Sequence, residues 1–94
     1  MTTAAVPTVF IDNDKVRVTE WRFAPGAATG WHRHDYAYVV VPLTTGQLKL
    51  VDGQGNATLA QLKAGVPYYR DAGVEHDVIN PNDVEFAFVE TEIK

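Results

Sequence analysis

The feature that most constrains the fold is the regular spacing of turn-forming residues, which divide the 94-residue chain into short segments. Glycine, proline, asparagine and aspartate cluster at these breaks, where they supply the backbone angles and side-chain hydrogen bonds that turns require. No segment keeps the apolar i, i+3, i+4, i+7 pattern of a helix. This pattern is typical of an all-β sandwich or barrel. About eight short strands are expected, over residues 7–11, 15–23, 30–42, 47–51, 57–62, 66–70, 75–79 and 85–93.

One expected strand carries two of the three histidines of the chain, His32 and His34. Alternate side chains of a strand share one face, so both imidazoles point the same way from Cα atoms about 6.6 Å apart. Tyr36 and Tyr38 follow on that face. The third histidine, His76, lies on a distant expected strand, and such a set predicts a facial tripod for a divalent metal. Because ligation needs neutral imidazole, metal affinity is expected to fall below about pH 6.5.

Length and composition narrow the possible functions. A single barrel domain is expected over 7–94, after an N-terminal segment, 1–6, that is expected to be loose. Such a short chain gains stability from a bound metal or a second subunit, so a homodimer is expected. The absence of cysteine excludes disulfides, thiolate ligands and a cysteine nucleophile.

Charge and hydropathy indicate the kind of partner. The net charge is −4 and no basic cluster is present, which argues against nucleic acid as a partner. No apolar stretch approaches the ~20 residues that span a bilayer, and no secretory leader pattern precedes the first expected strand. A cytoplasmic protein with a small-molecule partner, and with no membrane partner, is therefore expected.

Two motifs resemble those of the cupin family. The first family motif is a glycine, five residues, HxH and a later glycine; the second joins two glycines, a histidine and an asparagine at set spacings. The matching positions are Gly26, His32, His34 and Gly46 in the first motif and Gly65, Gly73, His76 and Asn80 in the second. The resemblance implies a small double-stranded β-helix, a jelly-roll barrel. The glycines are expected to be turn residues with special φ angles, and Asn80 to close a turn through its side chain.

The chain departs from the family pattern at the glutamate of the first motif. That position falls on Tyr38 or Val39, and neither is a carboxylate. Asp71 also replaces the proline of the second motif, a change expected to alter only a turn. Three neutral imidazoles leave a divalent ion with its full charge and at least one open position, which favours an anionic, chelating ligand. The chain resembles cupins without this glutamate, among them ferrous thiol and diketone dioxygenases, and also small cupins associated with β-alanine degradation.

The resemblance implies metal-dependent chemistry, dioxygenase-like or Lewis-acid, on a small chelating anion. Fe²⁺ is the expected metal, with Zn²⁺, Ni²⁺ and Mn²⁺ as alternatives, because imidazole accepts all four. The alternative is a non-catalytic module that binds a small molecule or uses the metal for structure or sensing. Two roles remain open for Tyr38: a fourth ligand or substrate-orienting hydroxyl, or an aromatic that only lines the barrel.

The remaining candidates lie on other expected strands. Tyr36, Tyr38, Phe86 and Phe88 are expected to wall a substrate pocket. Glu90 shares a face with Phe86 and Phe88, and it replaces the missing carboxylate only if that face is interior; the pattern leaves the choice of face open. Three charged residues are candidates for an ion pair or for anchoring an anion, namely Glu20, Arg22 and Arg70.

Overall fold

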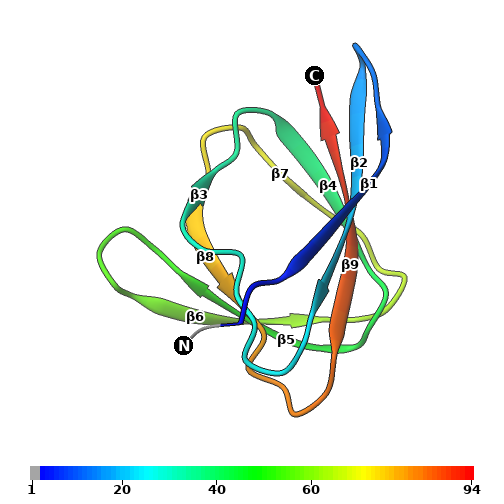
Figure 1. Cartoon of the computed structure of the whole chain (residues 1–94). Coiled ribbons are helices and arrows are strands. Elements are labelled where there is room, and N and C mark those ends of the chain that lie inside the picture. The colour runs from blue at the N-terminus through cyan, green and yellow to red at the C-terminus, as the bar shows by residue number, and fades with distance from the viewer. Residues whose placement is uncertain (1–2) are drawn as a thin grey trace.

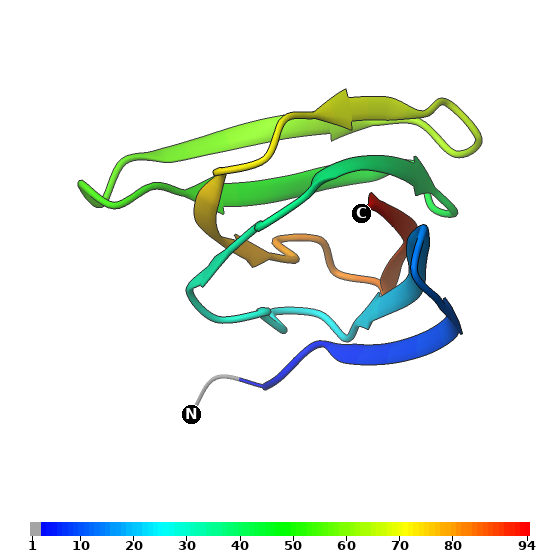
Figure 2. The same cartoon turned by 90° about the horizontal axis from the view of Figure 1, so that it is seen from above.

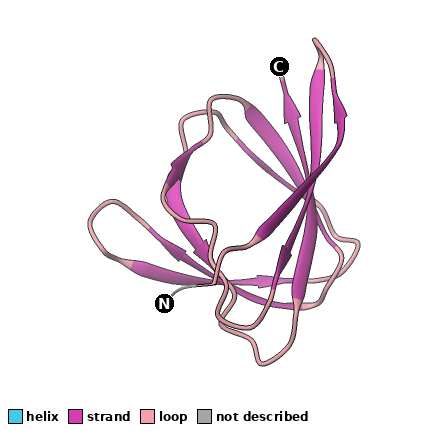
Figure 3. Cartoon of the chain, viewed as in Figure 1, coloured by secondary structure: helices cyan, strands magenta, loops and turns pink. Residues whose placement is uncertain are grey.

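The computed structural model describes residues 3–94, and Met1 and Thr2 lie outside the described residues. Strands joined by turns make up the described part of the chain, with no helix among them (Figures 1 and 3). The strands are β1 (Val6–Asp12), β2 (Val16–Phe23), β3 (His32–Arg33), β4 (Ala37–Pro42), β5 (Gly46–Val51), β6 (Ala57–Leu62), β7 (Tyr68–Arg70), β8 (Glu75–Ile79) and β9 (Phe86–Ile93). Residues 3–94 accordingly contain no helix long and apolar enough to cross a membrane.

The strands form two sheets around a common interior. One sheet has five strands in the order β1-β2-β9-β4-β7, and the other has four in the order β3-β8-β5-β6. In Figure 1 the sheets face each other, with β3 and β8 on the left and β2, β9 and β4 on the right. All the strand pairs in these ladders are antiparallel. The expected all-β double-stranded β-helix is confirmed.

The single strand expected over 30–42 is wrong, because the chain changes sheet within it. β3 pairs with β8 in the four-stranded sheet, whereas β4 pairs with β9 and β7 in the five-stranded sheet. At the corner, His34 donates its N–H to the carbonyl of Val74, 2.8 Å away, and accepts from the N–H of Gly73 at 2.7 Å. A continuous strand cannot pair with two facing sheets, so the chain bends at residues 35 and 36.

The core lies between the two sheets. Phe23 and Phe86 are fully buried, and their neighbours Phe88 and Val40 are also buried. Phe23 and Phe88 pack with ring centroids 5.6 Å apart, in the range of favourable aromatic pairs. This core holds β2, β4 and β9 together in the five-stranded sheet.

Two glycines of the motifs serve different purposes. Gly73 has a φ of 98°, which places it in the left-handed region that favours glycine, at the turn that contacts His34. Gly46 was expected to need a special φ, and that expectation is wrong, because its φ is not positive. A Cβ at Gly46 would instead lie 3.1 Å from Oδ1 of Asn82, so the close approach of that side chain favours glycine there.

Asn80 closes the turn region as expected and also joins three distant segments. Its side chain is fully buried, and its amide nitrogen donates to the carbonyls of Phe23, Ala24 and Val84 at 3.1, 3.3 and 2.9 Å. Its Oδ1 accepts from the N–H of Asn82 at 2.9 Å. Asn80 therefore fixes the loop that leads from β8 to β9 against the end of β2.

The N-terminal segment that was expected to be loose falls partly outside the described residues, at Met1 and Thr2. Within the described part, Ala5 is buried and donates its N–H to the carbonyl of Ala28, 2.9 Å away. Ala28 in turn donates to the carbonyl of Thr3 at 2.9 Å. Residues 3 to 5 thus run beside the segment that leads into β3.

Candidate metal centre

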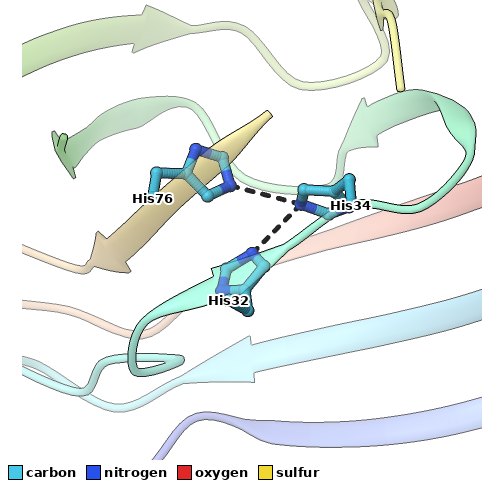
Figure 4. A group of neighbouring side chains, drawn as sticks. All are labelled: His32, His34 and His76. Carbon is cyan, nitrogen blue, oxygen red and sulfur yellow. Dashed lines mark hydrogen bonds between the residues drawn. The ribbon is translucent and has the colours of Figure 1, made fainter. Parts of the chain in front are cut away.

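The three histidines lie close together where β3 and β8 pair in the four-stranded sheet. His32 and His76 are directly opposite each other in the β3–β8 ladder, so the sheet register alone brings them together. His34 follows β3 and is held by its backbone bonds to Gly73 and Val74 at the chain corner. Figure 4 shows the three rings turned toward one another, from β3, the corner and β8.

The two nitrogen–nitrogen distances that involve His34 match those of a metal tripod. Nε2 of His34 lies 3.0 Å from Nε2 of His32 and 3.2 Å from Nε2 of His76, and the potential ligand atoms all lie within 4.8 Å of one another. Two nitrogens about 2.1 Å from one ion, at angles of about 90° to 109°, are about 3.0 to 3.4 Å apart. The cluster is therefore compatible with a divalent metal ion.

The hydrogen bonds of His32 leave its Nε2 free to ligate. Its Nδ1 lies 2.9 Å from the carbonyl oxygen of Gly30, which can only accept, so Nδ1 carries the proton and donates. Thr29 Oγ1, 3.2 Å from the same nitrogen, donates its own proton to the Gly30 carbonyl. The lone pair of neutral His32 is then on Nε2 and points into the cluster, as a metal ligand requires.

A buried carboxylate supports His34 from behind. Nδ1 of His34 lies 3.5 Å from Oε1 of Glu90, and both side chains are buried. Trp21 donates its indole N–H to the other carboxylate oxygen of Glu90 at 3.3 Å. A carboxylate on the second nitrogen orients a ligating imidazole and raises its basicity. Glu90 therefore faces the interior, which settles the face of β9, but it stands behind a histidine rather than in the cluster.

Burial keeps two of the imidazoles neutral. Burial first, and then the neighbouring His32 and His76, lowers the pKa of His34 to about 4; burial and His32 lower the pKa of His76 to about 4. At these two ligands, proton competition therefore begins well below the pH of about 6.5 that the sequence predicts. Unfolded histidine titrates near 6.5, so their contribution to metal-free stability is complete above that pH and is lost as pH falls toward about 4.

Glu90 has the opposite pH dependence. Burial, reinforced by the charge of Glu92, raises the pKa of Glu90 to about 7. A carboxyl that holds its proton more tightly when folded stabilises the fold at low pH, and this contribution is lost as pH rises through about 7. Between about pH 4.5 and 6.5 the two effects oppose each other, but two histidines act against one carboxyl, so the stability of the metal-free protein is expected to fall as the pH falls, less steeply than the histidines alone would cause.

A pocket of about 400 Å³ opens beside the histidine cluster. Tyr36, Tyr38 and Phe88 line it, as expected, together with the three histidines. Phe86, the other expected wall residue, is fully buried in the core and is not among the lining residues that the structure describes. The pocket is deep enough for a small molecule to contact the cluster and the aromatic walls together.

Comparisons with known proteins agree with this architecture. The sequence profile described as Cupin domain matches residues 19–92. The chain belongs to the cupin family. It is 62% identical over 90 residues to the β-alanine degradation protein BauB of Pseudomonas aeruginosa, an alignment that covers 96% of this chain and 94% of that protein.

Solved cupin structures have the same fold. The crystal structure of a cupin domain from Bordetella pertussis superposes with a TM-score of 0.96 at 60% identity, covering 100% of this chain and 97% of that one. A double-stranded β-helix protein from Klebsiella pneumoniae superposes with a TM-score of 0.77 at 21% identity, covering 96% of this chain and 76% of that one. The second likeness concerns the fold alone.

In this cupin, Tyr38, one of the two residues at which the missing family glutamate falls, contacts a histidine. Its ring stacks on that of His34, with centroids 4.0 Å apart and planes 21° apart. Burial, followed by the charge of Glu90, raises the pKa of Tyr38 above its ordinary value. The phenol therefore keeps its proton at neutral pH, and its hydroxyl can donate a hydrogen bond into the pocket. A role as a fourth ligand would require a metal to reverse that shift.

Sequence reasoning missed the support behind the histidines. The contacts of His34 with Glu90, of Glu90 with Trp21, and of His32 with Gly30 join segments far apart in the chain or depend on loop geometry. The alternation of β9 was a usable signal, since it groups Glu90 with Phe88, but it does not say which face is interior. No local pattern indicated the role of Gly30.

Replacing Glu90 tests the support that it provides to His34. Glu90→Gln is expected to weaken metal affinity by about 10- to 100-fold, because an amide orients the imidazole less strongly and does not raise its basicity. Competition with a chromophoric chelator measures this change. Glu92→Gln is the matched control: Glu92 also lines the pocket, two residues along β9, but pairs with Arg17. Equal losses in both variants would contradict a specific role for Glu90.

Proposed function

We propose that His32, His34 and His76 hold one divalent transition metal and that the cupin carries out metal-dependent chemistry on a small chelating anion. One observation carries this proposal: Nε2 atoms of all three histidines converge, at 3.0 and 3.2 Å, while Nδ1 of His32 is held by the Gly30 carbonyl. Lone pairs at such distances repel one another unless a proton or a cation lies between them. A divalent ion satisfies all three at once.

The proposed metal is iron, with zinc, nickel and manganese as alternatives. A bound ferrous ion would supply a redox-active centre for dioxygenase-like chemistry, whereas a redox-inert ion would supply a Lewis acid. The chain itself supplies the pocket around that centre. Tyr36, Tyr38 and Phe88 exclude water from the substrate, and the protonated hydroxyl of Tyr38 offers a hydrogen bond to an anionic oxygen.

The name of a relative supports a small acid as the substrate. The Pseudomonas aeruginosa protein, 62% identical to this chain, is named for β-alanine degradation. β-Alanine is itself a short carboxylic acid, in keeping with a pocket of about 400 Å³. We therefore propose that the substrate is a small carboxylate.

Oxygen consumption by the iron-loaded protein tests the catalytic proposal. Protein purified without oxygen and loaded with Fe²⁺ is expected to consume oxygen when its substrate is added, and the compounds to test are small carboxylates that also carry a thiol, diketone or hydroxyl group. The control is the same protein loaded with Zn²⁺, which cannot change oxidation state. Iron-loaded protein that consumes no oxygen with any of these compounds would exclude the dioxygenase version and leave Lewis-acid chemistry.

The alternative is a non-catalytic binding module. A chain of this size is marginally stable, and a bound metal would stabilise it without any chemistry. A metal that only stabilises the fold should raise the Tm strongly while leaving no position open to an added ligand. A metal that serves chemistry should keep an open position. Displacement of metal-bound water by azide or malonate, observed in the visible spectrum of a Co²⁺-substituted sample, separates the two functions.

We also propose that two copies associate through β1. All seven residues of this edge strand are exposed, including Val6, Phe10 and Ile11 at 60%, 57% and 47% exposure. Figure 2 shows β1 along one outer edge of the molecule, where it pairs only with β2. An open strand edge with exposed apolar side chains favours pairing with a second copy about a two-fold axis.

Light scattering coupled to size exclusion measures this association. The protein is expected to elute with the mass of a dimer, and Phe10→Glu is expected to shift it to the monomer by burying a charge in the interface. Leu59→Glu is the matched control, since Leu59 is 54% exposed on β6, the edge of the other sheet. A monomeric mass for the unmodified chain, or monomers caused equally by both variants, would contradict the proposal.

A further inference from the structure

Two of the three arginines that line the pocket form ion pairs. Arg33 forms ion pairs with Asp35 at 3.6 Å and with Glu75 at 3.3 Å. Arg17 lies 3.8 Å from Glu92. Arg70, the third arginine of the lining, takes part in no ion pair among residues 3–94. Among residues 3–94, Arg70 is therefore the one arginine of the pocket without an ion pair.

Arg70 is one of three candidates that the sequence offers for anchoring an anion, and the structure separates it from the other two. Arg22 donates to Glu20 at 2.6 Å and to Glu85 at 2.7 Å, so this pair of candidates neutralises itself. Neither Glu20 nor Arg22 lines the pocket as the structure describes it. Arg70 alone combines a place in the pocket with a free charge.

Arg70 is held in place by its neighbours. Its guanidinium carbon lies 4.6 Å from the ring centroid of Tyr68, a cation–π contact, and Nη1 donates to the carbonyl of Tyr69 at 3.0 Å. These contacts orient the group and leave most of its five N–H donors available. A planar guanidinium with free donors matches the two oxygens of a carboxylate.

The sheet register places Arg70 beside the residue that contacts the histidine cluster. Arg70 is directly opposite Tyr38 in the β7–β4 ladder, and Tyr38 stacks on His34. Facing side chains on neighbouring strands begin about 5 Å apart. One tyrosine ring thus lies between Arg70 and His34, and all three residues line the same pocket.

We infer that Arg70 binds the carboxylate of a short-chain acid whose second donor group is directed to the histidine cluster. The ligand class is a short-chain carboxylic acid with a further oxygen or nitrogen donor at the far end. The inference deepens the proposed function and rests on it, since the second donor is assigned to the proposed metal. Tyr38, between the two anchor points, would contact the middle of such a ligand.

Malonate and its monoamide, malonamate, test the anchor. They share length and one carboxylate, but only malonate can satisfy the metal and Arg70 with separate carboxylates. In zinc-loaded protein, calorimetry is expected to show malonate binding at least 10-fold tighter than malonamate, as a charge-assisted pair predicts. Arg70→Gln is expected to reduce this preference to about one, and Arg70→Lys to retain part of it.

Arg33→Gln is the matched control, because Arg33 also lines the pocket but is already paired with Asp35 and Glu75. It should keep the preference of the unmodified protein. A preference that survives in Arg70→Gln, or that is lost equally in Arg33→Gln, would overturn the anchor. Arg70 is exposed, so the variants should fold, and unchanged Tm values would verify this.

Zinc content, measured first on every sample, separates this inference from the proposed function. Bound zinc with a malonate preference that does not depend on Arg70 overturns the anchor and leaves the metal site standing. If no zinc binds, the proposed function fails, and the two ligands are compared in metal-free protein by following the Arg70 Nε–H resonance. A shift with malonate that is larger than with malonamate supports the anchor, and equal or absent shifts overturn it.

Discussion

His76→Ala is expected to abolish stoichiometric metal binding, with metal affinity reduced by more than about 100-fold. The variant removes one of three converging nitrogens, and even the loss of a supporting residue behind a ligand costs 10- to 100-fold. Elemental analysis of protein purified without oxygen should give about one equivalent of metal for the unmodified chain and almost none for the variant.

Glu75→Ala is the control for that experiment. Glu75 precedes His76 on β8, and its exposed side chain pairs with Arg33 instead of entering the cluster. The control should retain its metal and its Tm. Metal content that persists in His76→Ala would show that the ion is held elsewhere. An unmodified chain that binds no metal, even after loading with each candidate ion, would contradict the proposed site.

Asn80→Ala is expected to produce the largest loss of stability among the substitutions considered, about 3 kcal/mol in the free energy of unfolding. The change leaves the buried carbonyls of Phe23, Ala24 and Val84 without the amide that they share. For a chain of this size the Tm should fall by roughly 12 to 24 °C. Chemical denaturation and a thermal melt, both on metal-free protein, measure the effect without a contribution from the ion.

The control for this stability test is Asn56→Ala, at an exposed position in the β5–β6 turn. It should change the free energy of unfolding by less than about 1 kcal/mol. Similar losses in both variants would mean that the buried amide of Asn80 contributes no more than a turn residue does. The effect also bears on the site, because Asn80 follows the strand that carries His76.

The strand pattern was predictable because turn chemistry is local. The strands expected over 47–51, 57–62 and 75–79 agree with β5, β6 and β8 to within one residue. Each is short, bounded by glycine, proline or asparagine, and paired with neighbours within one sheet. The expected strand over 30–42 failed because its two halves pair with different sheets, and period-two alternation carries no information about such a corner.

The histidine cluster was predictable from motif spacing, whereas its surroundings were not. His32, His34 and His76 converge as expected. The contact between Glu90 and His34 depends on which face of β9 is interior. The alternation of side chains along a strand groups them into two faces but does not show which of the two faces is buried. The free charge of Arg70 depends on the positions of every carboxylate in the pocket.

By itself the sequence determined the all-β class, the cupin motifs and the identity of the three histidines, because turns and motif spacings are recorded in neighbouring residues. Only the tertiary structure decided that Glu90 contacts His34, that Tyr38 stacks beside it, and that Arg70 forms no ion pair within residues 3–94. These features arise where strands distant in the chain pair in a particular register. Such register is selected by the burial of the whole core, so no short stretch of sequence contains it.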